Sequence, residues 1–286
     1  MEGQRAKASV VWLVVCNRSR VWLLFVGPAL RCRMQVLSEL VAAGRERDGV
    51  LFATPERSAP YSYRDFCTNV WKGGNLMRHY GVREGMDVAV VVGPKNPADG
   101  DEPGYLRDCP DGLLAILAAT MDGAVADLAA GAEIDATALV APAGWLDRYE
   151  LAPGTQALAY GGPSDDPTVA AFERELWSEN PLQPPGERAP EDPALRDADG
   201  TYSHSELLTA SERVVESYDI DDEATVAFRA PVVSSGAVVA GLLAPLRAGA
   251  TVRFGDDSAS DVAVAVAGED VPEKTVVRPG DIGVSV

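Results

Sequence analysis

Residues 201–254 read TYSHSELLTASERVVESYDIDDEATVAFRAPVVSSGAVVAGLLAPLRAGATVRF, and this stretch decides the fold. It begins with a helix signal, because Ser203 can cap the first turn while the side chain of Glu206 can bond back to the cap. A short buried strand is predicted over 225–228, and a nearly all-apolar helix over 235–248 leads to a second strand. A strand, a helix and a strand at this spacing predict a right-handed parallel crossover.

The same plan occurs earlier in the chain. The segment YSYRDF from Tyr61 matches YSHSEL from Tyr202, and LLAILAATMDGAVADL from Leu113 matches VAGLLAPLRAGATVRF from Val239. Self-similarity of this kind indicates a repeated structural unit. We therefore predict an α/β protein that contains two related parallel-sheet units with flanking helices.

A proline-rich run, NPLQPPGERAPEDP, is the best candidate for a domain boundary. We predict a first α/β unit over 34–180, a linker over 181–193 and a second α/β unit over 194–286. Residues 1–33 differ from the rest, since they hold one acidic residue against six basic ones and two apolar runs too short to span a membrane. We expect that they are not part of the fold and that the natural start is Met34. A membrane-surface or targeting segment is the alternative.

The chain has 286 residues and a formal charge of −18, which argues against nucleic-acid binding because phosphate backbones require a basic surface. Abundant acidic residues with few lysines are typical of proteins adapted to high salt, where a dense carboxylate surface stays hydrated; an ordinary acidic protein is the alternative. The four cysteines form no CxxC pair and have no histidines nearby. A reduced, cytoplasmic protein without a metal site is therefore expected.

The chain offers few residues for catalysis, because it has two histidines. His79 is expected to cap a helix C-terminus, and His204, between Ser203 and Ser205 in a first helical turn, is predicted to lie at the surface. Dinucleotide, P-loop and GxSxG patterns are absent from the sequence. The loop over 93–110 follows a buried strand, but its acidic residues would repel a phosphate, so a solvated connection is predicted. No catalytic residue and no metal ligand is predicted.

The segment over 202–254 resembles the adenylate-forming superfamily, which includes the acyl-CoA synthetases. In that family a phosphate loop ending in PKG runs into an SHxNLL segment, and a strand ending in proline and a GLxxGLLAPLLAGATVV helix–strand follow. The segments SHSELL and GAVVAGLLAPLRAGATVRF match this order. The earlier YSYRDF and LLAILAATMDGAVADL look like the family's YTYxEL and FLAxLxAGAVxxPL. The resemblance covers most of 48–254 and implies the family's two related N-terminal subdomains.

The sequence departs from the family pattern where the phosphates would bind. PALRDADGT directly precedes SHSELL, and it lacks both the run of Ser, Thr and Gly and the lysine. Asp197 and Asp199 stand where backbone N–H groups should cradle phosphates. The histidine often found after the strand's proline is replaced by Ser234 or its neighbours. The YGxTE motif, the TGD motif and the C-terminal domain with its lysine have no counterpart in this sequence.

By family position, the resemblance implies nucleotide-binding residues at Ser203 and His204 and acyl-pocket residues at Ser234, Ser235 and Gly236. Because the phosphate apparatus is missing, we expect a non-catalytic, truncated relative with a binding, regulatory or assembly role and no cofactor. The alternative is the nucleotide- or acyl-binding half of a split acyl-adenylating enzyme, which would use ATP and Mg²⁺. The expected partner is a full-length acyl-CoA synthetase or a second copy of this chain, with neither nucleic acid nor a membrane span involved.

Overall fold

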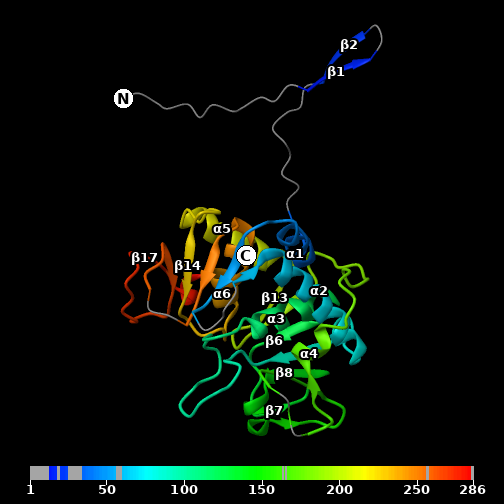
Figure 1. Ribbon diagram of the computed structural model, residues 1–286, viewed down its shortest axis with the longest axis vertical. Helices are drawn as coiled ribbons and strands as arrows, with labels where there is room; N and C mark the ends of the chain where they lie inside the picture. Colours follow the sequence, from blue (N-terminus) through cyan, green and yellow to red (C-terminus); the bar gives the residue numbers. More distant parts are fainter. Residues whose placement is uncertain are drawn as a thin grey trace. The chain divides into compact units, whose positions relative to one another are not determined.

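The computed structural model describes residues 13–17, 20–24, 34–55, 60–162, 164, 166–255 and 258–284. The chain divides into two units, Met1–Met34 and Gln35–Val286. In the first unit, β1 (Leu13–Asn17) and β2 (Arg20–Leu24) pair as an antiparallel hairpin (Figure 1). The other residues of the predicted 1–33 segment lie outside the described residues, so that prediction stays open for them.

A seven-stranded sheet runs through the second unit and is parallel except at one edge (Figure 1). In order across the sheet its strands are β11 (Ala170–Ala171), β10 (Gln156–Tyr160), β8 (Ala138–Pro142), β5 (Asp87–Val90), β6 (Val125–Asp127), β12 (Pro193–Arg196) and β13 (Thr201–Ser203). The antiparallel pair at the edge is β12 with β13. A separate parallel pair, β7 (Glu133–Ile134) with β9 (Glu150–Leu151), accompanies this sheet.

A six-stranded sheet follows the same plan. In order across the sheet its strands are β17 (Thr275–Val277), β16 (Val262–Val264), β14 (Thr225–Phe228), β15 (Thr251–Arg253), β3 (Val50–Ala53) and β4 (Tyr61–Ser62). All neighbours are parallel except β3 and β4, which form an antiparallel pair at the edge. The predicted crossover is confirmed, because β14 and β15 are adjacent and parallel.

The two sheets exchange strands, so they do not follow the predicted boundaries. The β3–β4 pair belongs to the first sequence repeat but extends the sheet of the second repeat. The β12–β13 pair precedes the second repeat's main helix but extends the sheet of the first repeat. A division into 34–180 and 194–286 is therefore corrected: each sheet takes its antiparallel edge from the other side of 181–193, and residues 35–286 form one unit.

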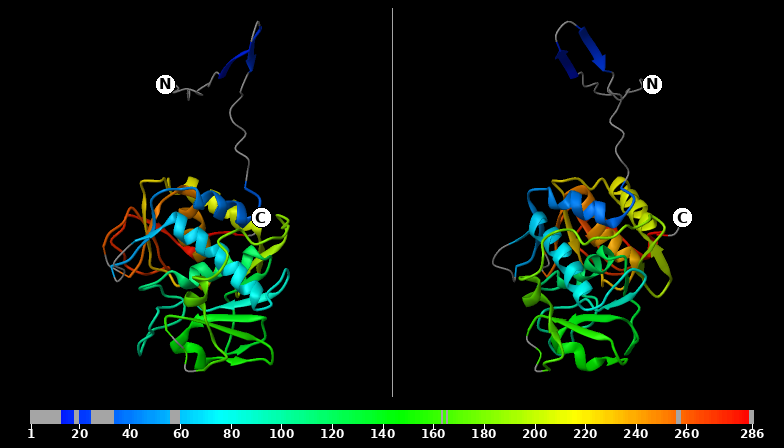
Figure 2. Two further views of the ribbon diagram at one scale, coloured as in Figure 1. Left: turned by 45° about the vertical axis from the view of Figure 1, so that its right-hand side comes forward. Right: turned by 90° about the vertical axis from the view of Figure 1, so that its right-hand side faces the viewer.

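Helices join the two halves of this unit, by which we mean the parts of the chain before and after the proline-rich segment 181–193. They are α1 (Leu37–Arg45), α2 (Tyr63–His79), α3 (Asp111–Met121), α4 (Phe172–Leu176), α5 (His204–Ser217), α6 (Ser235–Val238) and α7 (Ala244–Ala248), with 3₁₀ helices η1 (Ala143–Arg148) and η3 (Pro279–Asp281) and a π-helical segment η2 (Val239–Leu243). The blue helix α1 packs against the cyan helix α2 and the orange helix α7 (Figure 2). Gly44 on α1 permits this approach, because a Cβ atom there would lie 2.8 Å from Cys67 Sγ and 2.9 Å from a Leu246 methyl group.

The predicted helix over 235–248 is continuous but not uniform. It changes from α to π geometry over η2 and returns to α geometry in α7. Pro245, at the start of α7, cannot donate a backbone hydrogen bond to the preceding turn, which accounts for the π segment before it. Gly249 ends the helix in the left-handed conformation with φ of 99°, which glycine adopts without a steric penalty.

Helix α4 is short, and β11 comes directly before it. The reason is tertiary, since Ala170 and Ala171 pair with Leu158 and Ala159 at the edge of the seven-stranded sheet. Within the part of the chain that the structure describes, no helix is both long and apolar enough to cross a membrane.

Candidate functional site

The residues implied by family position lie where the two halves meet, and Ser203 acts as a helix cap. Its hydroxyl accepts the Glu206 N–H at 3.3 Å, and the Ser203 N–H donates to Glu206 Oε2 at 2.8 Å. The capping box predicted from the sequence is confirmed. Both polar groups of Ser203 are thereby engaged in the start of α5.

His204 is fully buried, so the predicted surface position is wrong. Its Nδ1 accepts the N–H of Leu37 at 3.3 Å and thus caps the first turn of α1. The pKa of His204 is lowered from 6.5 to about 4, chiefly by burial and also by the positive charge of Arg188, while Asp192 opposes the shift. The sequence could not show this, because α1 lies 167 positions away.

Asp197 occupies the position that the resemblance gives to a phosphate loop. Its buried carboxylate accepts three backbone N–H groups: Oδ1 takes those of Asp199 at 2.9 Å and Gly200 at 3.1 Å, and Oδ2 takes that of Ser235 at 2.6 Å. Burial raises the pKa of this carboxyl group, but these bonds outweigh burial, so the pKa lies below its usual value. The Asp197 carboxylate therefore engages the first amide donor of α6 and two amide donors of its own hairpin.

Ser234 and Gly236 complete this packed region. The Ser234 hydroxyl accepts the Ala237 N–H at 3.3 Å and caps α6. Gly236 packs directly on the backbone of η3, since a Cβ atom there would overlap the carbonyl oxygen of Pro279. The structure thus brings Ser234, Ser235 and Gly236 together around a helix start. The cavities described below are lined by other residues.

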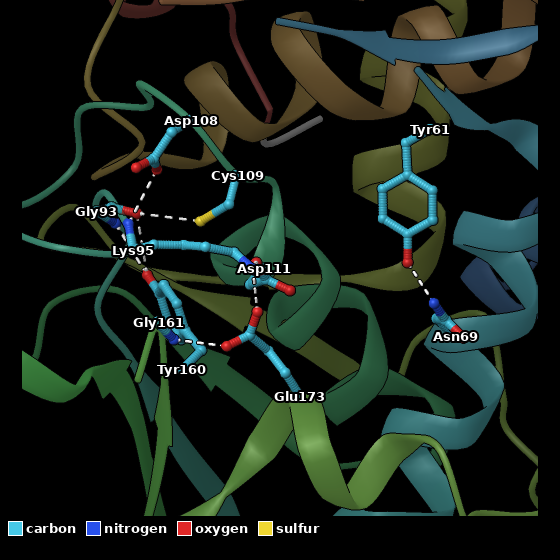
Figure 3. Close-up of polar contacts among 10 residues, drawn as sticks. All are labelled: Tyr61, Asn69, Gly93, Lys95, Asp108, Cys109, Asp111, Tyr160, Gly161 and Glu173. Atoms are coloured by element: carbon cyan, nitrogen blue, oxygen red, sulfur yellow. Dashed lines mark hydrogen bonds and ion pairs between the residues drawn. The ribbon is translucent and has the colours of Figure 1, made fainter. Parts of the chain in front are cut away.

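A second region lies at the carboxyl edge of the seven-stranded sheet and centres on Lys95 (Figure 3). Lys95 follows β5, Asp111 is the first residue of α3, and Glu173 lies in the first turn of α4. The ends of β5 and β8 are adjacent, and the chain leaves them in opposite directions, toward β6 and toward β10. Parallel α/β sheets bind ligands at such a switch point.

The ammonium group of Lys95 is held between two carboxylates. Nζ donates to Glu173 Oε1 and lies 4.0 Å from Asp111 Oδ2. Burial lowers the pKa of Lys95, but the bond to Glu173 and the charge of Asp111 outweigh burial and raise it. The amine is therefore charged at neutral pH.

Buried polar groups fix the strand ends beneath Lys95 (Figure 3). The Tyr160 hydroxyl donates to the Val91 carbonyl at 2.9 Å and accepts the Gly93 N–H at 3.0 Å. The other carboxylate oxygen of Glu173 accepts the Gly161 N–H at 2.6 Å. Cys109 is buried, and burial raises the pKa of its thiol, which keeps the sulfur unreactive.

A cavity of about 650 Å³ opens on one side of Lys95, and a second of about 580 Å³ lies on the other. The larger cavity is lined by residues of α2, α4 and the adjoining segments: Pro60, Tyr61, Asp65, Thr68, Asn69, Lys72, Lys95, Asp111, Glu173, Leu176 and Trp177. Its size is that of a pocket for a small organic molecule. Among the described residues, no cluster of three or more His, Cys, Asp or Glu could hold a metal ion.

The sequence interpretation missed Lys95, Asp111 and Glu173. The loop over 93–110 was predicted to be a solvated connection, but the Lys95 N–H binds Asp108 Oδ1 at 2.9 Å and the Lys95 side chain is half-buried. One signal was available, because Lys95 is a rare lysine in an acidic chain and follows a buried strand. Its partner Glu173 is 78 positions away, and the sequence alone does not bring the two together.

No family model and no curated protein sequence matches the chain, but solved structures share its fold. The fold is that of the N-terminal part of adenylate-forming acyl-CoA ligases. The anthranilate CoA ligase AuaEII, in complex with anthranoyl-AMP, is 14% identical with a TM-score of 0.61, over 80% of this chain and 49% of that chain.

Two further solved structures give the same result. A benzoate CoA ligase from Burkholderia xenovorans LB400 is 14% identical with a TM-score of 0.61, over 80% of this chain and 50% of that chain. The N-terminal domain of FACL13 from Mycobacterium tuberculosis is 13% identical with a TM-score of 0.60, over 81% of this chain and 63% of that chain. The chain spans about half the length of the two CoA ligases.

Proposed function

We propose that this chain binds a small organic ligand without adenylating it, on the fold of the N-terminal part of an acyl-CoA ligase. The observation that carries the proposal is the Asp197 carboxylate, which accepts the backbone N–H groups of Asp199, Gly200 and Ser235. Two of these donors, the N–H groups of Asp199 and Gly200, stand where the resemblance places a phosphate loop. An incoming phosphate would have to displace a buried carboxylate that three hydrogen bonds hold in place.

Charge adds to this obstacle. At an effective dielectric constant of about 20, two like unit charges ~4 Å apart repel by about 4 kcal/mol. The hairpin between β12 and β13 has the sequence PALRDADGT and contains no lysine that would offset the repulsion. Transfer of an adenylyl group depends on electrostatic stabilisation of the phosphate, so this hairpin favours binding over catalysis. Neither ATP nor Mg²⁺ is part of the proposed function, and both belong to the split-enzyme alternative.

ATP–pyrophosphate exchange with a panel of carboxylic acids tests the proposal. We expect no exchange above the background of a protein-free sample, at either low or molar salt. The matched control is the Asp197→Asn variant, which keeps the shape of the side chain and removes its charge. Exchange by the wild-type chain that requires one particular acid, and that the Asp197→Asn change abolishes, would show an adenylating enzyme and overturn the proposal.

An assembly role with a second copy of this chain is a second candidate. Two large apolar side chains, Trp177 and Leu182, are 85% and 64% exposed, and both segments bind α2. Exposed apolar groups that lie together are typical of interaction surfaces. Light scattering that gives the mass of a dimer, and of a monomer after Trp177→Ser, would support this role, whereas a monomer in both cases would reject it. A cytoplasmic location stays a prediction.

A further inference from the structure

We propose that the cavity beside Lys95 selects a small organic amine, whose ammonium group is seated by Asp111 and Glu173. This inference rests on the proposed ligand-binding function and names the chemical class of the ligand. It takes its support from the charges that line the cavity, from the exposure of the Lys95–Glu173 pair and from the apolar side chains at the cavity mouth.

The lining of the cavity favours a cation over an anion. It contains three carboxylates, Asp65, Asp111 and Glu173, against two ammonium groups, Lys72 and Lys95. The whole chain carries a formal charge of −18, so the surrounding potential adds to the local excess of negative charge. A carboxylate ligand would meet one lysine already held by Glu173 and an overall repulsive field. A ligand ammonium group is instead attracted by the carboxylates of the lining and by the overall negative charge.

The position of Lys95 shows that an ammonium group is stable there. Its Nζ contacts Glu173, while Asp111 Oδ2, at 4.0 Å, is within ion-pair range but beyond hydrogen-bond distance. The side chains of Lys95 and Glu173 are 37% and 30% exposed, so a ligand can reach the pair from solvent. Glu173 Oε2 also accepts the Gly161 N–H, but Glu173 keeps acceptor capacity for a ligand ammonium group, since a carboxylate oxygen can accept more than one bond.

The cavity also provides a place for the body of such a ligand. Leu176 and Trp177, at the end of α4, line the cavity together with Tyr61, whose hydroxyl accepts a hydrogen bond from Asn69 (Figure 3). Trp177 is largely solvent-exposed, so its ring can be covered by a ligand. Aromatic faces attract organic cations, which adds to the preference for an amine. The expected ligand is therefore an ammonium group on a short apolar or aromatic body.

The other sheet gives a built-in comparison. After β14, Arg229 binds Glu273 through two bonds, Nη2 to Oε1 at 2.7 Å and Nε to Oε2 at 3.3 Å. The Glu273 side chain is fully buried there. The two halves thus place an ion pair at comparable sheet edges. Arg229 borders a cavity of about 240 Å³, whereas the more exposed Lys95–Glu173 pair borders one of about 650 Å³.

Titration calorimetry with three probes of similar size tests the inference: phenethylamine, hydrocinnamate and phenethyl alcohol, each added to the full chain at physiological salt. We expect saturable binding of phenethylamine, with hydrocinnamate and phenethyl alcohol at least about tenfold weaker, since the ammonium group contributes the charge interaction. The Glu173→Gln change should weaken phenethylamine binding about fivefold or more, while Glu216→Gln, the same charge change on the exposed face of α5, should leave it unchanged.

Trp177→Ala provides a second variant at an exposed position, where folding is least affected, and it should also weaken phenethylamine binding. Stronger binding of hydrocinnamate would overturn the choice of an amine but leave the ligand-binding function standing. Absence of phenethylamine binding, or equal loss in Glu173→Gln and Glu216→Gln, would overturn the inference at this cavity. Neither result depends on ATP–pyrophosphate exchange, so failure of the proposed function is detected separately.

Discussion

The two halves of the second unit follow one plan, and each completes the sheet of the other. The orders β10-β8-β5-β6-β12-β13 and β17-β16-β14-β15-β3-β4 correspond strand by strand, with an antiparallel pair at the same edge. Each antiparallel pair comes from the opposite side of the proline-rich segment. Because the sequence repeats and the sheets do not coincide, a cut at 181–193 would remove the antiparallel edge pair from both sheets.

Equivalent positions in the two halves also anchor each half to the other. Tyr63 and His204 are the first residues of α2 and α5, and both are buried. The Tyr63 hydroxyl contacts the carbonyl oxygens of Pro245 at 3.0 Å and Ala250 at 2.7 Å, which belong to the second half. His204 Nδ1 accepts the N–H of Leu37, which belongs to the first half. The first residue of the helix thus anchors one half to the other in both repeats. Tyr63 does so through its hydroxyl group, and His204 through an imidazole nitrogen that accepts a hydrogen bond.

The halves differ most at their carboxyl edges, and the largest expected effect tests this difference. Removing one partner of the buried Arg229–Glu273 pair, by Arg229→Ala, should lower the free energy of unfolding by about 3–5 kcal/mol, because Glu273 is left buried without its counter-charge. Urea unfolding measures the loss. The double change Arg229→Met with Glu273→Gln should recover most of it. A loss for Arg229→Ala no larger than that for Lys95→Ala would show that the buried and the exposed ion pair contribute equally to stability.

The two anchors should respond differently to pH. Since the pKa of folded His204 is about 4 against 6.5 when unfolded, the neutral form is favoured in the fold. Its contribution is complete above pH 6.5 and is lost as the pH falls toward 4. At 1.36 kcal/mol for each pKa unit, the loss amounts to about 3 kcal/mol. In His204→Asn the amide oxygen can still accept the Leu37 N–H but does not titrate, so the difference in stability between wild type and variant should shrink over this range. A pH-independent difference would contradict the buried, neutral histidine.

The tyrosine anchor should give a smaller effect. Tyr63→Phe keeps the ring and removes the hydroxyl, which leaves two buried carbonyl oxygens, those of Pro245 and Ala250, without this donor. We expect a loss of about 1–3 kcal/mol that does not change between pH 4 and 7. Thermal unfolding monitored by circular dichroism at several pH values provides the measurement. Tyr80→Phe, at a partly buried position near the end of α2, serves as the comparison. Equal stability of Tyr63→Phe and wild type would show that this anchor contributes nothing.

The smallest effect is expected at the open edge. Lys95→Met should change the free energy of unfolding by at most about 1 kcal/mol, because the Lys95–Glu173 pair is partly exposed and solvent screens it. Molar salt should reduce even this difference, whereas it should leave the Arg229→Ala loss nearly unchanged. Unfolding in low and in molar salt, on both variants, tests the contrast. A salt-independent loss of several kcal/mol at Lys95 would identify it as a structural residue.

Local signals in the sequence predicted most elements of the fold. Ser203 with Glu206 located the start of α5, and the strand over 225–228 was predicted at its observed bounds. These features depend on contacts within a few residues. The strand exchange could not be predicted, because pairing of β3 with β15 joins residues about two hundred positions apart and no local pattern specifies that edge. The repeat correctly indicated two sheets but not which strands each one receives.

The site was less accessible to sequence reasoning for the same reason. Asp197 was recognised as foreign to a phosphate loop, but its three amide partners include Ser235 from a different element. His204 was predicted at the surface because it falls in the first turn of a helix, whereas its burial follows from the distant helix α1. The Lys95–Glu173 pair joins the loop after β5 to the short helix α4, which follows β11. In the sheet, β8 and β10 lie between these two strands. Residues whose roles depend on tertiary contacts were thus missed or misplaced, and residues with local roles were not.

Calorimetric titration of the wild-type chain with Mg²⁺–ATP, up to millimolar nucleotide, tests the central claim most directly. That claim is that the Asp197 carboxylate already holds the amide groups that a phosphate would need. The predicted result is a featureless titration at both low and molar salt. A saturable heat with one-site stoichiometry in the wild-type chain would contradict the account, because it would show that the hairpin accommodates a triphosphate with its carboxylate in place.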